Sequence, residues 1–437
     1  MNSQSLLDRS KGRFFAFGIL YISEGILVGF TSTAMVAFMR REGLSLEQIG
    51  TFVALLYLPW TFKWVWAPLI DIVKLQRFGG RRTWILFCTA MMIGTLLITA
   101  MVDYVVNFQL LLIMIVINNF FGATQDVAID SLAVSPLKAD ERGTGNGFMF
   151  SGQFLGIALG GGGAIFVSGL WGFNVSIIYI CSLMLLCFLF VLFFIRDPDI
   201  SAKAGESGTE IVSKLVDTLA GFMRELYTGF LQSGSGPKIG LLFAVMPMGA
   251  MALAYAILGT MEVDYGLSNN QIATLSVYNT VLSGLGCLAG GLLGDKLGLK
   301  KILAMCYVLT AFPTLYLAAQ ISINGLEAVS LVSFYAAILL HGLFFGMGTG
   351  LNAAVFMGMT NPLVAATQFT AFMAMSNLAI SMANYWQGRV AEAIDYAAVL
   401  YLDSLLVVLP LLLIPFLKNR EEHGVKETMM PAAARID

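Results

Sequence analysis

Residues 291–303 read GLLGDKLGLKKIL, and this short charged segment lies between the apolar stretches 268–293 and 302–322. Its two glycines permit a tight turn and close packing. Its acid and its bases can interact with one another across the ends of two helices. A loop that merely gathers cations at one membrane face would explain the lysines, but not an aspartate between two glycines. The residues concerned are Gly291, Asp295, Lys296, Gly298, Lys300 and Lys301.

Twelve apolar stretches, each long enough to cross a bilayer, surround this segment. A transmembrane helix needs about 20 mostly apolar residues. Hydrophobic residues make up 58% of the 437 and charged residues 12%, which excludes a water-soluble core. We therefore expect an all-α membrane protein with twelve transmembrane helices in two pseudo-symmetric halves of six. The stretches are 13–39, 47–73, 83–102, 108–134, 143–170, 174–195, 239–264, 268–293, 302–322, 328–358, 364–390 and 397–418.

One polar segment divides these stretches six and six. It predicts an N-terminal bundle (1–195), a cytoplasmic linker (196–238), a C-terminal bundle (239–418) and a cytoplasmic tail (419–437). Within the linker, Ile211, Leu215, Leu219, Phe222 and Leu226 recur at helical spacing, which predicts an amphipathic helix along the membrane surface. FFGATQDVAID at 120–130 and FFGMGTGLNAA at 344–354 are weakly similar, as expected for repeats with a substrate path between them.

Positive charges fix the expected orientation. Of the 25 Lys and Arg residues, 21 fall on the side that holds both termini and the linker. Arg40, Arg41 and Arg389 fall on the other side, and Lys63 lies within a span. Cytoplasmic loops carry the excess of Lys and Arg. We therefore expect a multi-pass protein of the bacterial inner membrane with both termini in the cytoplasm.

Cofactor and nucleotide motifs are not found in the sequence. All five cysteines fall inside apolar stretches, so we read them as small core residues, not as disulfides or metal ligands. There is no G-x-x-x-x-G-K-[ST] segment, which argues against ATP-driven transport. We expect no cofactor, no metal and no nucleic-acid partner; the partners expected are a small-molecule solute, protons and the lipid bilayer around a monomer.

The segment at 291–303 resembles the signature turn of the major facilitator superfamily, G-x-L-x-D-[RK]-x-G-x-[RK]-[RK]. The resemblance implies an alternating-access transporter without naming its substrate. The equivalent turn in the first half is longer. Its basic pair, Arg81 and Arg82, follows Asp71 at a spacing five residues greater than the spacing from Asp295 to Lys300 and Lys301. We expect these turns to gate the conformational change.

Three segments of the first half resemble AmpG-type permeases, the peptide and acetyl-CoA transporter branch of that superfamily. They are LSLEQIGTFVALLYLPWTFKWVWAPLID (44–71), RFGGRR (77–82) and FFGATQDVAIDSLAVSPLKADERGTGNG (120–147); ATQFTAF (366–372) adds support. The resemblance implies a large polar solute without choosing among the muropeptides, siderophores and acetyl-CoA that members of the branch carry. We expect proton-coupled import of a muropeptide-like amphipathic solute by alternating access. AmpG itself commonly has hydrophobic segments beyond twelve, so a siderophore permease of the same branch is the alternative.

Few ionisable side chains lie within the apolar stretches, and such residues are costly there and candidates for function. Asp126 and Asp130 share one helical face with Asn119, and this stripe must face protein or water. Lys63 lies at a similar depth and can hold one aspartate ionised. The alternative is a permanent bridge from Lys63 to Asp126 or Asp130 that only fastens helices. Both aspartates are candidates for proton coupling.

Two further residues are candidates for the proton site. Glu24 lies near the middle of the first span with Tyr21 on its face, too deep to reach the interface, and we prefer it as the proton-binding carboxylate. A neutral, hydrogen-bonded structural glutamate is the alternative. His341 has a suitable ordinary pKa, although a lone histidine in a helix is equally often a core residue.

The eleventh span offers a small and polar face for a solute, with Asn377, Ser381 and Asn384 at helical steps and Tyr385 beside them. Aromatic rings in the second span can stack on sugars, although tryptophan near a span end often anchors the interface. The substrate-binding candidates are Tyr21, Tyr57, Trp60, Trp64, Asn119, Gln125, Asn377, Ser381, Asn384 and Tyr385.

Two other classes of function are less compatible with these residues. An intramembrane enzyme would need a constellation such as paired His and Asp on facing helices, but His341 stands alone in its span. We therefore expect no enzymatic activity. A non-transporting receptor or assembly factor would keep the fold and dispense with the buried carboxylates.

Overall fold

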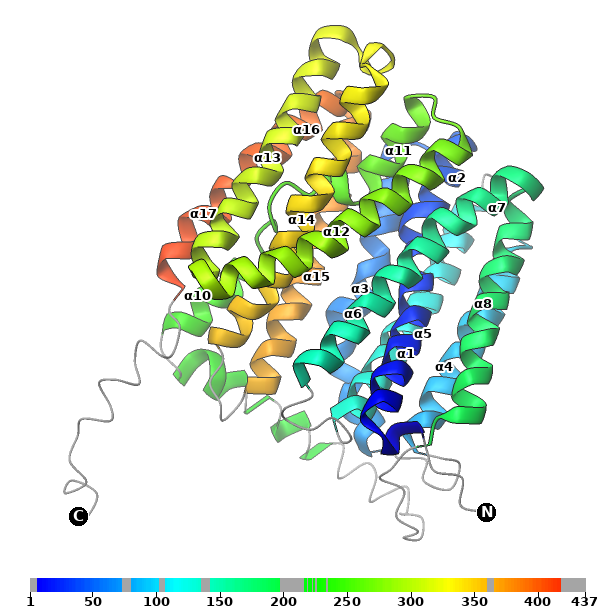
Figure 1. Cartoon of the computed structure of the whole chain (residues 1–437), viewed down its shortest axis with the longest axis vertical. Helices are drawn as coiled ribbons and strands as arrows, with labels where there is room; N and C mark the ends of the chain where they lie inside the picture. Colours follow the sequence, from blue (N-terminus) through cyan, green and yellow to red (C-terminus); the bar gives the residue numbers. More distant parts are fainter. Residues whose placement is uncertain are drawn as a thin grey trace, which may run out of the picture.

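The described part of the chain folds almost entirely into helices (Figure 1). The computed structural model describes residues 6–72, 80–101, 107–134, 142–196, 216–217, 219–221, 223–224, 226–232, 235–359 and 365–417. None of these described residues forms a strand. The predicted tail at 419–437 and most of the predicted linker lie outside the described residues.

Six spans form the first half. The first runs through a π-helical turn, as does the fifth, and the others are single helices. In chain order they are α1 (Ser10–Gly29), η2 (Phe30–Ala34) and α2 (Met35–Arg41); α3 (Leu46–Ile72); α4 (Arg81–Thr99); α5 (Phe108–Val134); α6 (Arg142–Ala158), η5 (Leu159–Gly163) and α7 (Ala164–Trp171); and α8 (Phe173–Phe194).

Six spans form the second half. They are α10 (Ser235–Ala244), η7 (Ala252–Ala254) and α11 (Ala256–Asp264); α12 (Asn269–Leu297); α13 (Leu299–Asn324); α14 (Leu331–Met359); α15 (Ala365–Ala393); and α16 (Tyr396–Leu406), α17 (Val408–Leu413) and η9 (Ile414–Phe416). Short turns complete the described chain at η1 (Leu6–Asp8), η6 (Thr228–Gln232) and η8 (Leu326–Ala328).

The expected twelve-span, all-α fold is confirmed. Within the described residues, nine helical stretches are long and apolar enough to cross a membrane. The other three spans are not among these nine: α3 and α15 are long helices with polar side chains along them, and the seventh span is interrupted. All three carry side chains that contact the opposite half, as described below.

The seventh span corrects the sequence prediction of one continuous helix over 239–264. Helix α10 ends at Ala244 and α11 begins at Ala256. Pro247 has no backbone N–H to donate, and Gly249 has a φ of +88°, a conformation that favours glycine. The average apolarity of this stretch had hidden both helix breakers.

Glycines allow several helices to touch through their backbones. A Cβ atom on Gly156 of α6 would lie 2.3 Å from the carbonyl oxygen of Ile22 on α1, so only glycine fits. Between the halves, a Cβ on Gly50 of α3 would lie 2.6 Å from the carbonyl oxygen of Asn384 on α15. Small residues at such crossings let helices pack closely where lipid gives no hydrophobic driving force.

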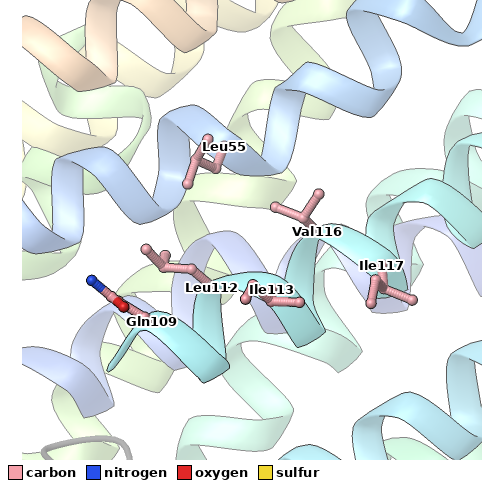
Figure 2. Close-up of a pocket in the computed structure, with 6 residues that line it drawn as sticks. All are labelled: Leu55, Gln109, Leu112, Ile113, Val116 and Ile117. Atoms are coloured by element: carbon pink, nitrogen blue, oxygen red, sulfur yellow. The ribbon is translucent and has the colours of Figure 1, made fainter. Parts of the chain in front are cut away.

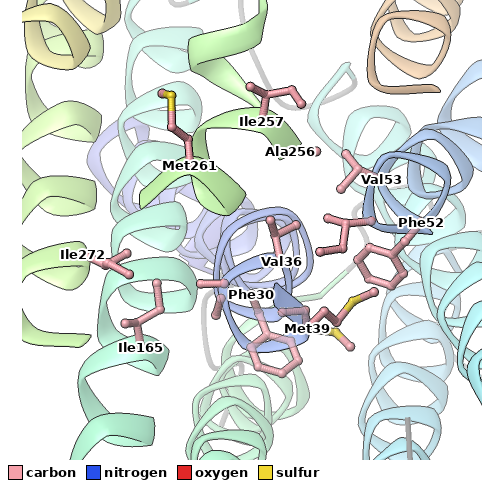
Figure 3. Close-up of a cluster of buried hydrophobic side chains, with 14 of the residues drawn as sticks. Phe30, Val36, Met39, Phe52, Val53, Ile165, Ala256, Ile257, Met261 and Ile272 are labelled. Atoms are coloured by element: carbon pink, nitrogen blue, oxygen red, sulfur yellow. The ribbon is translucent and has the colours of Figure 1, made fainter. Parts of the chain in front are cut away.

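The two halves meet through a buried apolar cluster at one end of the bundle (Figure 3). We call this the upper end, at which α2 ends at Arg41; the lower end is where α1 begins at Ser10. Phe30, Val36 and Met39 of the first half pack in the same cluster as Ile257, Met261 and Ile272 of the second half. From this upper end, α12 and α6–α7 diverge toward the lower end (Figure 1).

Candidate functional site

An ion pair lies in the interior of the first half. Lys63 Nζ on α3 contacts Asp126 Oδ2 on α5, and their side chains are 20% and 5% exposed. The ammonium group also lies 5.5 Å from the centroid of the Trp60 ring. Of the two aspartates that the sequence offered to Lys63, the geometry therefore pairs it with Asp126.

Asp130, one turn further along α5, has a different partner. The Tyr21 hydroxyl on α1 donates to Asp130 Oδ1 at 2.5 Å. Asp130 is exposed although it lies in a membrane-spanning helix, and Lys63 is partly exposed. Exposed charges in such a helix face water inside the protein and not lipid. Asp130, toward the lower end of the α5 stripe, is therefore open to water, whereas Asn119 and Asp126 are buried.

Glu24 is the third carboxylate of this cluster. It is 6% exposed, and Gln153 Nε2 on α6 donates to its Oε1 at 2.7 Å. Its other oxygen, Oε2, is buried without a hydrogen-bond partner in the described part of the chain. The charges of Asp126, Lys63 and Asp130 act on it. Three carboxylates therefore lie near one ammonium group, and Asp126 is the one in contact with it.

The substrate-binding candidates on α5 lie on two different faces of that helix. Asn119 Oδ1 accepts from Trp60 Nε1 at 3.4 Å, which keeps it near Lys63. Gln125 instead donates to Thr89 on α4 at 2.6 Å, on the side of α5 away from the cluster. Trp64 is half-buried on α3.

Of the polar face predicted on the eleventh span, Ser381 and Asn377 bond to the other half, and Asn384 bonds within its own half. The Ser381 hydroxyl on α15 donates to the Ala54 carbonyl on α3 at 2.8 Å, and Asn377 Nδ2 donates to the Trp60 carbonyl at 3.4 Å. Asn384 Oδ1 accepts the backbone N–H of Ala256 at 3.1 Å. Tyr385 is exposed near the upper end, with the Arg389 guanidinium 4.4 Å from its ring centroid.

Buried polar residues of the second half surround the interrupted seventh span. His341 Nε2 lies 2.8 Å from the Ala250 carbonyl oxygen, so this histidine is tied to the backbone. Sequence reasoning missed two carboxylates in the second half, Glu262 and Asp403, which are 2% and 1% exposed. Asp403 lies in the middle of an apolar stretch, and applying the rule for ionisable residues within spans to that stretch would have found it.

All three arginines that break the positive-charge rule connect the halves at the upper end. Arg40 donates to both carboxylate oxygens of Asp264, at 2.7 and 2.6 Å, and Tyr396 donates to the same carboxylate at 2.7 Å. Arg41 donates to the Leu267 carbonyl at 2.6 Å. Arg389 pairs with Glu47 at 3.0 Å. These contacts hold the upper end closed.

The two signature turns lie at the lower end. Gly298 has a φ of +100° between α12 and α13, as a tight turn there requires. Lys296, Lys300 and Lys301 surround it, and a Cβ atom added to Gly291 would meet no described atom within 4 Å. The side chains of Asp295 and Asp71 lie outside the described residues. In the first-half turn, Arg81 begins α4 and Arg82 donates to the carbonyls of Val191 and Leu192 at the end of α8.

An apolar pocket of about 440 Å³ lies apart from the charged cluster (Figure 2). Leu55 from α3 forms one wall, and residues near the start of α5 form the other, from Gln109 to Ile117. Its lining is almost wholly hydrocarbon, which suits a lipid chain better than a polar solute.

Known transporters resemble this chain in sequence along most of its length. The Major Facilitator Superfamily model matches residues 14–238 and 239–431. The Anhydromuropeptide permease of Escherichia coli (strain K12) is 26% identical over 384 residues, covering 86% of this chain and 74% of the permease. The "Putative transporter AmpG 4" of Rickettsia felis is 20% identical over 416 residues, covering 94% of this chain and 97% of that protein.

Solved structures share the fold. The nucleoside transporter NupG superimposes with a TM-score of 0.65 at 15% identity, covering 93% of this chain and 98% of that one. The inward open conformation of the xylose transporter XylE from E. coli gives a TM-score of 0.67 at 14% identity, covering 91% and 95%. At such identities the likeness concerns the arrangement of helices and not the substrate.

Breaking the Lys63–Asp126 pair is expected to destabilise the folded protein. Either Lys63→Met or Asp126→Asn leaves one buried charge without its partner, a change that typically costs about 3–5 kcal/mol. The double variant removes both charges and should recover part of the loss. The measurement is the unfolding midpoint in detergent, with exposed Lys296→Met as the control. Single losses that simply add in the double variant would contradict the pairing.

Weakening the upper-end ion pair is expected to favour opening of that end. In a cysteine-free background, Val36→Cys reports opening, because Val36 is fully buried in the apolar cluster. Arg40→Ala or Asp264→Ala should raise its labelling by a membrane-impermeant thiol reagent. Arg389→Ala is the matched control, since the Arg389 and Glu47 side chains are 52% and 47% exposed and such pairs contribute about 0–1 kcal/mol. Equal labelling in both variants would exclude a special role for Arg40.

Proposed function

This chain belongs to the Major Facilitator Superfamily, and from that premise we propose that it imports a muropeptide-like amphipathic solute across the bacterial inner membrane, coupled to protons. Members of this family are multi-pass membrane transporters, not enzymes. The observation that carries the solute class is the match to the E. coli Anhydromuropeptide permease over 86% of this chain. The siderophore alternative gains no support from the comparisons.

The charged cluster supports proton coupling. A coupling site must bind a proton in one state and release it in another, and Glu24 has one buried oxygen without a hydrogen-bond partner in the described chain. Lys63 and Asp126 are tied to each other. We assign Glu24 as the proton site, with Lys63 as the charge partner that links it to Asp126 and Asp130.

The orientation proposal rests on charge. With the lower end in the cytoplasm, 21 cations lie on that side, and the three on the other side are the arginines of the upper-end contacts. The upper end, closed in this structure, then faces the outside. A cysteine at Asn269, the partly exposed first residue of α12 at the upper end, should react with an impermeant reagent only from the outside of right-side-out vesicles. Labelling only in inverted vesicles would overturn this orientation.

We propose that the linker (196–238) attaches to the second half as a surface element. Phe230 is buried and meets the Phe372 ring edge-on at 5.5 Å, and Gln368 Nε2 donates to the Gly229 carbonyl at 2.5 Å. Nearby Tyr227 and Leu231 are exposed, as suits a helix lying in the membrane interface. The working unit is proposed to be the monomer.

Transport in proteoliposomes tests the proposed function. Purified protein loaded with unlabelled anhydromuropeptide should take up the radiolabelled compound by counterflow, and a ferric siderophore should not compete. Tight binding without counterflow would instead support the receptor alternative. Uptake of the siderophore but not of the anhydromuropeptide would overturn the proposed solute.

Glu24→Gln is expected to separate exchange from accumulation. A permanently neutral side chain can still cycle when solute is bound, so counterflow should persist, but accumulation driven by a pH gradient should be lost. Glu42→Gln, at an exposed position beyond the same span, is the matched control and should keep both activities. Full gradient-driven accumulation by Glu24→Gln would show that this glutamate is only structural.

A further inference from the structure

The break in the seventh span is held by a carboxylate that no transport step above uses. Asp403 Oδ2 on α16 accepts the backbone N–H groups of Met251 and Ala252, at 2.6 and 2.8 Å. Asp403 Oδ1 accepts from Gln387 Nε2 on α15 at 2.8 Å. Both oxygens therefore act as acceptors, the pattern of an ionised carboxylate. Backbone donors at membrane depth have no water to replace these bonds.

Three more helices hold the same break. The Thr310 hydroxyl oxygen on α13 accepts the Ala250 N–H at 3.0 Å, and His341 on α14 bonds the Ala250 carbonyl. Asn384 on α15 accepts the Ala256 N–H, the first of α11. Each of these side chains is at most 1% exposed. The break is thus a fixed element of the fold, with side chains from four helices bonded to its backbone.

An aromatic contact between the halves follows directly from the break. Tyr255, the last residue before α11, meets the ring of Tyr57 on α3 edge-on, with centroids 5.8 Å apart. On its other side Tyr255 meets Phe345 on α14 at 6.0 Å. Tyr57 precedes Lys63 by six residues on the same helix, about 9 Å along its axis. The aromatic trio therefore lies between the charged cluster and the closed upper end.

We propose that Asp403 is a positioning residue, which holds the break so that Tyr255 and Tyr57 form the upper wall of the solute site. The two rings come from opposite halves and meet edge-on, so their contact is made where a solute path between the halves would run. Aromatic rings with polar tips are suited to a solute that presents sugar rings and polar groups. The solute class rests on the proposed function; the positioning of Tyr255 by Asp403 does not.

The test compares Asp403→Leu with Ser404→Ala, a buried neighbour on the same helix whose hydroxyl has no partner in the described chain. Hydrogen exchange of the peptide covering residues 245–256 should rise about tenfold in Asp403→Leu, because two backbone N–H groups lose their acceptor. Ser404→Ala should match the wild type. Unchanged hydrogen exchange in Asp403→Leu would show that Asp403 does not hold the break. If Asp403→Leu does not fold, Gln387→Leu is tested instead; it removes the side chain that donates to Asp403 Oδ1 but leaves the acceptor of the two N–H groups, so the exchange should rise by a smaller factor.

Kinetics separate positioning from a purely structural role. For anhydromuropeptide counterflow, Asp403→Leu should raise KM about tenfold with a much smaller change in maximal rate, since it displaces a binding wall. Asp403→Asn retains an acceptor oxygen and should restore most of the affinity. Tyr255→Ala should raise KM equally while leaving hydrogen exchange near Met251 unchanged. An unchanged KM in Asp403→Leu would overturn the proposal.

A readout without solute distinguishes failure of this inference from failure of the proposed function. Cysteines replacing Tyr57 and Tyr255 in a cysteine-free background should be joined by a short bifunctional thiol reagent, and Asp403→Leu should reduce that yield severalfold. If wild-type protein shows no saturable anhydromuropeptide exchange, the proposed function fails, and the crosslinking yield alone decides the positioning role. Equal yields with and without Asp403→Leu would overturn it.

Discussion

Hydrocarbon offers no water to a backbone amide or a charge, and the arrangement of this protein depends on that constraint. Lys63 is matched by Asp126. Asp403 accepts hydrogen bonds from the backbone of the unwound turn before α11, and Thr310 and Asn384 accept hydrogen bonds from the backbone on either side of it. Each of these charged and backbone groups is therefore bonded to a side chain of a neighbouring helix. Because the partners come from different spans, satisfying these groups also sets how the spans pack.

The two halves differ in the partners of their buried charged side chains. In the first half, Lys63 pairs with Asp126 inside the bundle, and Asp130 on the same helix is exposed. In the second half, Asp403 is fully buried, and backbone and amide donors surround it with no cation among its described bonds. In the proposed function, the first arrangement changes its protonation as the bundle moves. The second arrangement, around Asp403, holds the backbone of the seventh span in one conformation.

Several of the polar contacts between the halves are individually weak. Ser381 and Asn377 donate to α3 carbonyls, and the arginine contacts above them are partly or largely exposed. Exposed pairs contribute little each, and the apolar cluster beside them is shared by both halves. An alternating-access protein needs such an interface, since its closed state must be stable enough to seal and still be able to open.

The sequence by itself determined the twelve-span, all-α fold, because span length and apolarity are set by bilayer thickness, and it singled out Glu24, Lys63 and Asp126 because charges in apolar stretches are conspicuous. It also identified the family from short motifs. Tertiary structure alone decided which aspartate Lys63 contacts, and that Gln125 faces α4 while Ser381 and Asn384 face other helices. A periodic pattern places a residue on a helix face, but the rotation of that helix against its neighbours depends on contacts between spans far apart in the chain. The break in the seventh span was missed because the average apolarity of that stretch hid Pro247 and Gly249. The side chains that stabilise the unwound turn come from four other helices, and only the tertiary structure brings them to it.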